Sequence, residues 1–248
     1  MTDETLRVAR SHFPVTALGP GRRFGVWVQG CPLACKGCMS LDTWDSDGGA
    51  EVPVDELVAR WHDALDQGAG GLTVSGGEPL AQPGPLAAFL DAAHRISAGR
   101  PGEPDILMFT GYTPEELDAE QRLAASYADV LVTGRYEAGQ PTRLVWRGSA
   151  NQQMVLQSEL SRRRYAPYLD LEPDQPPLQV RSDEHGVWIV GVPLRGTLPR
   201  LDHEMRHRGL STESVTWRPA VRQNRAGGAK APVRMTTEKP DDDGSELP

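Results

Sequence analysis

Cysteine is nearly absent from this chain: its 248 residues contain three cysteines, and all of them lie within one stretch of eight residues. An odd and tightly clustered set is a poor disulfide framework for a small secreted domain. Cysteine is also missing from the expected core positions, where its side chain would be tolerated. We therefore expect Cys31, Cys35 and Cys38 to be present for their chemistry.

Other features are missing as well. No apolar run approaches the length of a membrane span, and the acidic N-terminus, residues 1–5, lacks the apolar centre of a signal peptide. The formal net charge of −8 provides no general attraction to nucleic acid or to an anionic membrane. These absences predict a cytoplasmic protein that binds neither nucleic acid nor membrane.

Apolar and polar periodicities alternate along the first two thirds of the chain. The expected strands cover residues 23–29, 71–75, 105–110 and 130–132, and the expected helices cover residues 54–65, 85–96 and 113–127. Such alternation favours an α/β fold with a parallel sheet and helices outside it. A complete eight-unit barrel typically needs about 250 residues, so the pattern predicts a partial (β/α) barrel or an open sheet of about five or six units.

The composition also divides the chain. We expect a loose N-terminal lead-in at residues 1–12 and a core domain at 13–165. An acidic, proline-rich linker precedes a small ββα C-terminal unit at 178–216, in which a hairpin is followed by a helix. Residues 217–248 are rich in glycine, proline and charge, which predicts a disordered tail.

The three cysteines have the spacing C-x3-C-x2-C. Three thiolates on one short loop suit three irons of a cubane iron–sulfur cluster, and the fourth iron is left open because the chain has no other cysteine. The alternative is a zinc-binding module without enzymatic activity. Structural zinc usually takes four ligands, so the fourth would be a distant histidine such as His12 or His62.

A second candidate segment follows the strand at 71–75, and its residues are Ser75, Gly76, Gly77, Glu78 and Pro79. Two glycines at the end of a strand allow the backbone to approach a ligand closely. The carboxylate of Glu78, which follows the two glycines, would suit an ammonium group. Taken alone, the segment also fits an ordinary Gly-Gly turn.

Together, the cysteine loop after a first strand and the later Gly-Gly-Glu-Pro segment resemble the radical SAM enzymes. The resemblance implies a partial (β/α) barrel of the radical SAM type, with the ββα unit as an appendage. It also implies a [4Fe–4S] cluster on Cys31, Cys35 and Cys38, with S-adenosylmethionine as the ligand of the open iron. Residues 75–79 would bind that cofactor, and its reductive cleavage would generate a 5′-deoxyadenosyl radical.

Further motifs are similar to those of the activating proteins of anaerobic ribonucleotide reductase and, more loosely, of the pyruvate formate-lyase activating enzymes. These motifs occupy residues 19–23, 43–44, 110–113, 129–134 and 147–152. The resemblance covers about residues 13–155. It implies a glycyl radical enzyme as partner and an electron donor such as flavodoxin or ferredoxin.

Three polar residues in these motifs are candidates for facing the cofactor or the substrate, because strand ends in α/β folds bind ligands. Thr110 and Arg135 are assigned to the cofactor site, and Asn151 is a further candidate. Each also has a structural interpretation, as a turn residue, a surface ion pair and a helix cap respectively.

The sequence departs from the family pattern after the third cysteine, where Met39-Ser40 stands in place of the His-Asn of the reductase activators. Radical modification of a peptide or small molecule remains an alternative function.

Overall fold

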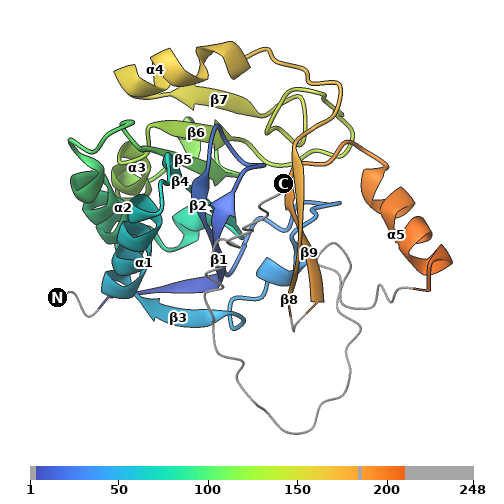
Figure 1. Cartoon of the computed structure of the whole chain (residues 1–248), viewed down its shortest axis with the longest axis horizontal. Coiled ribbons are helices and arrows are strands. Elements are labelled where there is room, and N and C mark those ends of the chain that lie inside the picture. Colours follow the sequence, from blue (N-terminus) through green and yellow to red (C-terminus); the bar gives the residue numbers. More distant parts are fainter. Residues whose placement is uncertain (1–3, 184–185, 210–248) are drawn as a thin grey trace, which may run out of the picture.

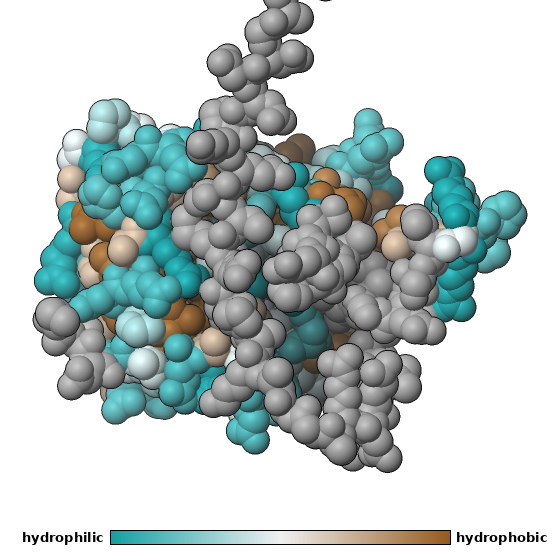
Figure 2. All heavy atoms as spheres, turned by 60° about the horizontal axis from the view of Figure 1, so that its bottom comes forward, coloured by the Kyte–Doolittle hydropathy of each residue, from teal (hydrophilic) through white to brown (hydrophobic). Residues whose placement is uncertain are grey.

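The computed structural model describes residues 4–183 and 186–209 (Figure 1). The expected tail at 217–248 and the end of the expected C-terminal unit lie outside the described residues. Among the described residues, no helix has the length and apolar character that crossing a bilayer would require. The described part of the surface in Figure 2 is mainly hydrophilic, with small and separate hydrophobic patches.

A seven-stranded sheet with the strand order β3-β1-β2-β4-β5-β6-β7 forms the centre of the protein. The strands are β1 (Thr5–Val15), β2 (Arg23–Val28), β3 (Ala50–Pro53), β4 (Gly71–Gly76), β5 (Asp105–Thr110), β6 (Val130–Thr133) and β7 (Gln153–Leu156). The helices of this part are α1 (Val54–Asp66), α2 (Pro83–Ser97), α3 (Ala119–Ser126) and α4 (Glu159–Tyr165). Four short 3₁₀ helices are η1 (Leu41–Thr43), η2 (Pro79–Ala81), η3 (Pro114–Glu116) and η4 (Ala166–Tyr168).

The four central strands β2, β4, β5 and β6 are parallel, whereas β1 and β7 pair antiparallel to their neighbours. The expected α/β class is therefore confirmed, and the expected all-parallel sheet is corrected to a mixed one. Because neighbouring parallel strands end at the same edge, the segments that follow β2, β4, β5 and β6 meet there. This edge carries the residues that the sequence singled out.

One face of the sheet is covered by α1, α2 and α3, which lie together on one side in Figure 1. In α1, Val54, Leu57, Trp61 and Ala64 recur at helical spacing, and all four are buried. The Nε1 group of Trp61 donates to the carbonyl oxygen of Ala93 in α2 at 3.3 Å. The apolar stripes that the sequence shows in these helices thus form the main core.

The opposite face is covered by later parts of the chain. Trp27 of β2 lies in a cluster with Val15, Leu18 and Val190, while Val132 of β6 belongs to a second cluster. That second cluster also contains Leu107, Val130, Val145, Trp146, Met154 and Tyr165. Residues C-terminal to the sheet therefore complete a core that the helices cover on one side only.

A buried charge network lies at the amino ends of the parallel strands. The Nη2 group of Arg23 donates to Oδ1 of Asp105 at 2.6 Å, and both side chains are fully buried. The hydroxyl of Tyr165 donates to the same oxygen at 2.6 Å, and Nη1 of Arg164 donates to Oδ2 at 2.5 Å. Burial alone would raise the pKa of Asp105, but these partners hold it below its ordinary value.

Two sequence expectations are corrected. The lead-in is not loose, because β1 is a strand that pairs with both β2 and β3. Along its first residues, buried and more exposed side chains alternate, and Leu6 and Val8 are the buried ones. The helix expected at 113–127 is two elements, because Asp118 provides a second N-cap by accepting from the backbone N–H of Gln121 at 2.8 Å. Thr113 does cap the first turn, in a capping box with Glu116 as expected.

The sequence also missed β3, β7 and α4, which are short elements without a clear period. The expected hairpin is present as β8 (Leu178–Asp183) and β9 (Gly186–Gly191), and the expected helix is α5 (Thr197–His207). In Figure 1 the hairpin lies beside β1 on the side away from α1–α3, and α5 stands apart from the sheet. The division into domains remains a prediction.

Candidate functional site

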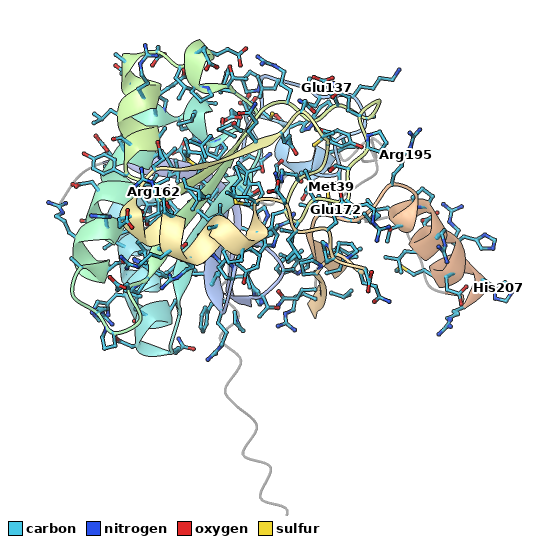
Figure 3. The ribbon with its side chains drawn as sticks, turned by 90° about the horizontal axis from the view of Figure 1, so that it is seen from above. Met39, Glu137, Arg162, Glu172, Arg195 and His207 are labelled. Atoms are coloured by element: carbon cyan, nitrogen blue, oxygen red, sulfur yellow. The ribbon has the colours of Figure 1, made fainter. Side chains whose placement is uncertain are left out.

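The cysteine loop leaves the carboxyl end of β2 and returns to the sheet through η1. The backbone N–H of Gly30 donates to the carbonyl of Thr43 at 2.8 Å, and that of Cys31 donates to the carbonyl of Trp44 at 3.2 Å. These bonds close the loop at its base. Gly37 has a φ of +84°, a left-handed conformation that glycine adopts without strain. Figure 3 shows Met39, which follows the third cysteine, at a distance from Arg162 of α4.

All three cysteines are free thiols with half-buried side chains. Burial is the main cause that raises the pKa of Cys31; hydrogen bonds from the backbone of Leu33 and Ala34 oppose the shift, and the nearby Glu78 adds to it. Within the described residues, no three His, Cys, Asp or Glu side chains already surround a common point. The thiols would therefore have to turn toward a shared cluster when it binds.

The donor set fits an iron–sulfur cluster better than it fits zinc. The fourth zinc ligand would have to be His12 or His62. The ring of His12 is buried, and its Nε2 lies 3.1 Å from Nε of Arg181. His62 is exposed on α1, where it pairs with Asp66 at 3.3 Å. Neither histidine joins the thiols in the described structure, which leaves three sulfur donors on one loop, the set that a cluster with one open iron needs.

The Gly-Gly-Glu-Pro segment packs directly against the base of the cysteine loop. The backbone N–H of Glu78 donates to the carbonyl of Gly30 at 2.9 Å, and that of Gly77 donates to the carbonyl of Val28 at 2.9 Å. A Cβ atom on Gly77 would lie 2.2 Å from the oxygen of Gly30. Only glycine allows this approach, so the segment is more than an ordinary turn: it is joined to the residue before Cys31.

Glu78 connects the end of β4 to the end of β5. Its carboxylate is buried and accepts from the hydroxyl of Thr110 at 2.8 Å and from the backbone N–H of Gly111 at 2.7 Å. A third bond comes from the backbone N–H of Leu80 at 3.0 Å. Burial raises the pKa of Glu78, and these donors partly oppose the shift. A carboxylate has about four acceptor positions, so one remains for a ligand.

The remaining residues of this segment are positioned by the backbone. Ser75 is half-buried in β4 and lies beside Trp27 in the strand register. Gly76 has a φ of +109° and packs on the backbone of Val28. Pro79 is buried at the first position of η2. The structure thus brings Thr110 and residues 75–79 together beside Cys31.

Arg135 has other partners. Its guanidinium donates to both carboxylate oxygens of Glu116 at 2.7 and 2.8 Å, and it lies over the ring of Tyr112 at 5.7 Å from the centroid. The side chain is 41% exposed, and the bond to Glu116 raises its pKa. The surface ion pair that the sequence allowed as an alternative is therefore present. A role in cofactor binding remains a prediction.

Asn151 and Gln152 hold the loop after β6. Nδ2 of Asn151 donates to the carbonyl of Arg135 at 2.9 Å, and Nε2 of Gln152 donates to the carbonyl of Gly134 at 2.8 Å. Oδ1 of Asn151 is buried and has no hydrogen-bond partner in the described structure. Buried polar atoms are nearly always paired, so this acceptor is a natural point for a ligand donor.

Tyr136 was missed by the sequence analysis. A Cβ atom on Gly37 would lie 3.4 Å from Cε1 of this ring, and one on Gly148 would lie 3.0 Å from Cδ2. The ring therefore packs between the cysteine loop and the turn that precedes Asn151. The two glycines were visible in the sequence, but nothing in their spacing shows that one tyrosine fills the space between them.

Comparison with known proteins identifies the family of this chain. Residues 17–155, more than half of the chain, match the family described as 4Fe-4S single cluster domain. The anaerobic ribonucleoside-triphosphate reductase-activating protein of Vibrio cholerae is 38% identical over 147 residues, which are 57% of this chain and 92% of that protein. The Escherichia coli K12 protein of the same name is 35% identical over 147 residues, 57% of this chain and 93% of that protein.

A protein of that name from Enterobacteria phage T4 is 35% identical over 139 residues, 55% of this chain and 85% of that protein. Among solved structures, that of QueE from Escherichia coli has a TM-score of 0.38 and 15% identity, over 52% of this chain and 71% of that one. That likeness is too low to carry an argument. The chain belongs to the 4Fe-4S single cluster domain family and, with these relatives, to the radical SAM activating enzymes.

Proposed function

We propose that this protein cleaves S-adenosylmethionine reductively at a [4Fe–4S] cluster and uses the resulting 5′-deoxyadenosyl radical to install a glycyl radical on a partner enzyme. The observation that carries the proposal is the set of three free thiols on one loop, with no fourth cysteine in the chain. A cluster held in this way keeps one iron open for a ligand.

Cys31, Cys35 and Cys38 would hold the cluster. When bound, it would supply the electron that breaks the carbon–sulfur bond of the sulfonium. The protein's own residues bind and orient the cofactor. The remaining acceptor position of Glu78 suits its ammonium group, and the unpaired Oδ1 of Asn151 suits one of its N–H or O–H donors.

Thr110 would act through Glu78. Its hydroxyl donates to Oε1 and accepts from the backbone N–H of Tyr112 at 3.1 Å, so it fixes the rotamer of the carboxylate that meets the ammonium group. We keep Ser75, Gly76, Gly77, Pro79 and Arg135 in the proposed cofactor site. We also infer that the strands β2, β4, β5 and β6 form the partial barrel of the radical SAM type.

The partner that we propose is an anaerobic ribonucleotide reductase, because the relatives activate such an enzyme by name. A glycine on the partner would donate the hydrogen atom. A flavodoxin or ferredoxin would supply electrons, and the cytoplasm is the compartment that keeps the thiols reduced.

The first experiment tests the chemistry alone. The full chain is purified without oxygen, reconstituted with iron and sulfide, and given S-adenosylmethionine and dithionite. We expect 5′-deoxyadenosine from the wild type and none from Cys35→Ala. Lys36→Ala is the matched control, because it changes an exposed side chain in the same loop. Equal product from Cys35→Ala, or one zinc and no iron in the protein, would refute the proposal.

One observation favours a second candidate, which is radical modification of a peptide or small molecule. The family match ends at residue 155 and leaves residues 156–248 outside it, and that part contains the hairpin on the sheet. Incubation with an anaerobic ribonucleotide reductase separates the two functions. A glycyl radical doublet in the electron paramagnetic resonance (EPR) spectrum of the reductase supports activation, and its absence despite 5′-deoxyadenosine formation supports the second candidate.

A further inference from the structure

The β8–β9 hairpin lies beyond the family match at 17–155, yet it is joined to strand β1 of the sheet. The backbone N–H of Thr16 donates to Oε1 of Gln179 at 3.0 Å, and Nε2 of Gln179 donates to the carbonyl of Pro14 at 2.8 Å. Farther along β8, Nε of Arg181 lies 3.1 Å from Nε2 of His12. The hairpin therefore runs along β1, from the end of that strand toward its middle.

Trp188 of β9 anchors the hairpin to the helix-free face of the sheet. Its ring meets the ring of His12 edge-on at 5.1 Å between centroids and that of Trp27 at 5.8 Å, with interplanar angles of 89° and 79°. Val190, two residues later, is buried in the cluster that contains Trp27. Edge-to-face geometry is the favoured arrangement of aromatic pairs, so Trp188 has a defined position above the sheet.

Arg10 extends this contact toward the cysteine loop. Its guanidinium lies 5.6 Å from the centroid of a Trp188 ring and forms an ion pair with Asp42. Asp42 lies in η1, four positions after Cys38. The side chains of Arg10 and Asp42 are 29% and 27% exposed, so the contact is screened less than a fully exposed pair.

The segment that contains Asp42, residues 39–45, brings the chain from the third cysteine back to the sheet, and we call it the return segment. Nε2 of Gln29 donates to the carbonyls of Asp42 at 3.2 Å and Asp45 at 2.7 Å. The backbone of the return segment is thus held by Gln29, the residue that follows β2. The carboxylate of Asp42 forms an ion pair with Arg10, which lies in β1.

We propose that Trp188 is a positioning residue for the cluster site. By holding Arg10 against Asp42, it fixes the return segment and with it the orientation of Cys38. The hairpin, which lies outside the family match, then supports the cysteine loop. The inference rests on the proposed function only where it concerns the cluster.

The test uses the full chain and four variants. Trp188→Ala removes the ring, Trp188→Phe keeps an aromatic ring, and Arg10→Gln breaks the link while the contacts of Trp188 with His12 and Trp27 stay in place. Val180→Ala is the matched control, because Val180 is 57% exposed on the same hairpin. Hydrogen–deuterium exchange is measured for the return segment and, separately, for β9.

We expect exchange in the return segment to be about two- to fivefold faster in Trp188→Ala and Arg10→Gln. This is the change that corresponds to the loss of one cation–π contact at a partly exposed site. Trp188→Phe should be closer to the wild type, and Val180→Ala should match it. Exchange in β9 should rise in Trp188→Ala only. Unchanged exchange in the return segment, or an equal rise throughout the core, would overturn the inference.

The cluster provides a second readout. In the reconstituted protein, Arg10→Gln should shift the EPR spectrum of the reduced cluster, whereas Val180→Ala should not. An unshifted spectrum in Arg10→Gln counts against the positioning of Cys38. A wild type that takes up no iron and sulfide would refute the proposed function, and the exchange data from the protein without a cluster would still decide whether Trp188 holds the return segment.

Discussion

At the scale of single residues, Glu78 and Asp105 are both buried carboxylates with opposite surroundings. Glu78 has only neutral donors bonded to it, and burial raises its pKa. Asp105 has two arginines bonded to it, which lower its pKa. The first lies at the carboxyl edge of the sheet, where a cationic ligand would complete its environment. The second is already neutralised by the protein and serves the fold.

Glu78→Gln should weaken the binding of S-adenosylmethionine by about tenfold or more, because an interaction with a charged group contributes about 1.5–3 kcal/mol. Anaerobic titration calorimetry of the reconstituted protein measures this change. The control is Glu103→Gln, which removes an exposed ion pair with Arg163 outside the proposed site and should change affinity little. Equal affinities for the two variants would contradict the assignment of Glu78.

Asp105→Asn should lower the free energy of unfolding by about 3–5 kcal/mol, because it leaves the buried charge of Arg23 without its counterion. Denaturant titration at pH 7 measures the loss. Arg162→Ala, which removes an exposed pair with Glu159 on α4, should have little effect.

Asp105 also makes stability depend on pH. Its pKa is lower in the folded than in the unfolded state, so its contribution is present above the ordinary aspartate pKa of about 3.9 and is lost as the pH falls through the folded value. The wild type should therefore lose more stability than Asp105→Asn when the pH falls below about 4. Parallel acid-side curves for the two proteins would show that another carboxylate is responsible.

At the scale of elements, the turn between β4 and η2 and the base of the cysteine loop are built as one unit. The backbones of Gly77 and Gly30 approach so closely that no side chain fits between them. Residues 75–79 and the cysteine loop therefore cannot move independently. A substitution that displaces the backbone of either turn should also displace the backbone of the other.

Gly77→Ala should lower the iron and sulfide that the protein takes up, because the new Cβ would displace the carbonyl of Gly30 beside Cys31. Overpacking of this kind costs about 1–3 kcal/mol. Gly84→Ala is the matched control: it lies in α2 with no atom within 4 Å of the added Cβ, and alanine there favours the helix. Normal iron and sulfide content in Gly77→Ala would mean that the cysteine loop can hold its cluster even when the two turns are moved apart.

At the scale of the whole molecule, the sheet is covered by helices on one face and by C-terminal elements on the other. Trp27 and Leu18 contact Val190 in one cluster, and Tyr165 of α4 reaches the Arg23–Asp105 pair. The parts of the chain beyond the family match therefore complete the packing of the core. Their removal should affect stability before it affects chemistry.

A chain that ends at residue 174 should bind a fluorescent apolar dye more strongly and melt at a lower temperature than the full chain, because the loss of β8 and β9 exposes Trp27 and Leu18. A chain that ends at residue 209 is the control, since it retains the hairpin. Dye fluorescence and thermal melting measure both effects. If the two shortened chains behave alike, the hairpin does not protect this face.

Local sequence determined those features that depend on near neighbours along the chain. The periodic apolar residues of α1 and α2, the hairpin, the capping box at Thr113 and the three-cysteine loop are all visible without a structure, because side-chain period and cap chemistry are local. The same reading failed for β1 and for the break at Asp118. In β1 the alternation of apolar and polar residues covers only the start of the strand, which makes it a weak signal. At Asp118 two capping signals compete within six residues.

Only the tertiary structure decided which distant residues meet. Glu78 with Thr110, Tyr136 between Gly37 and Gly148, and Trp188 above Trp27 all join segments that are far apart in sequence. Such pairs depend on the order in which distant strands join the sheet, which no local pattern encodes. The cysteine loop and the Gly-Gly-Glu-Pro segment together indicated the kind of chemistry from the sequence alone. The folding of distant segments around the cysteine loop decided which side chains lie beside it, because contacts between distant residues arise only when the chain folds.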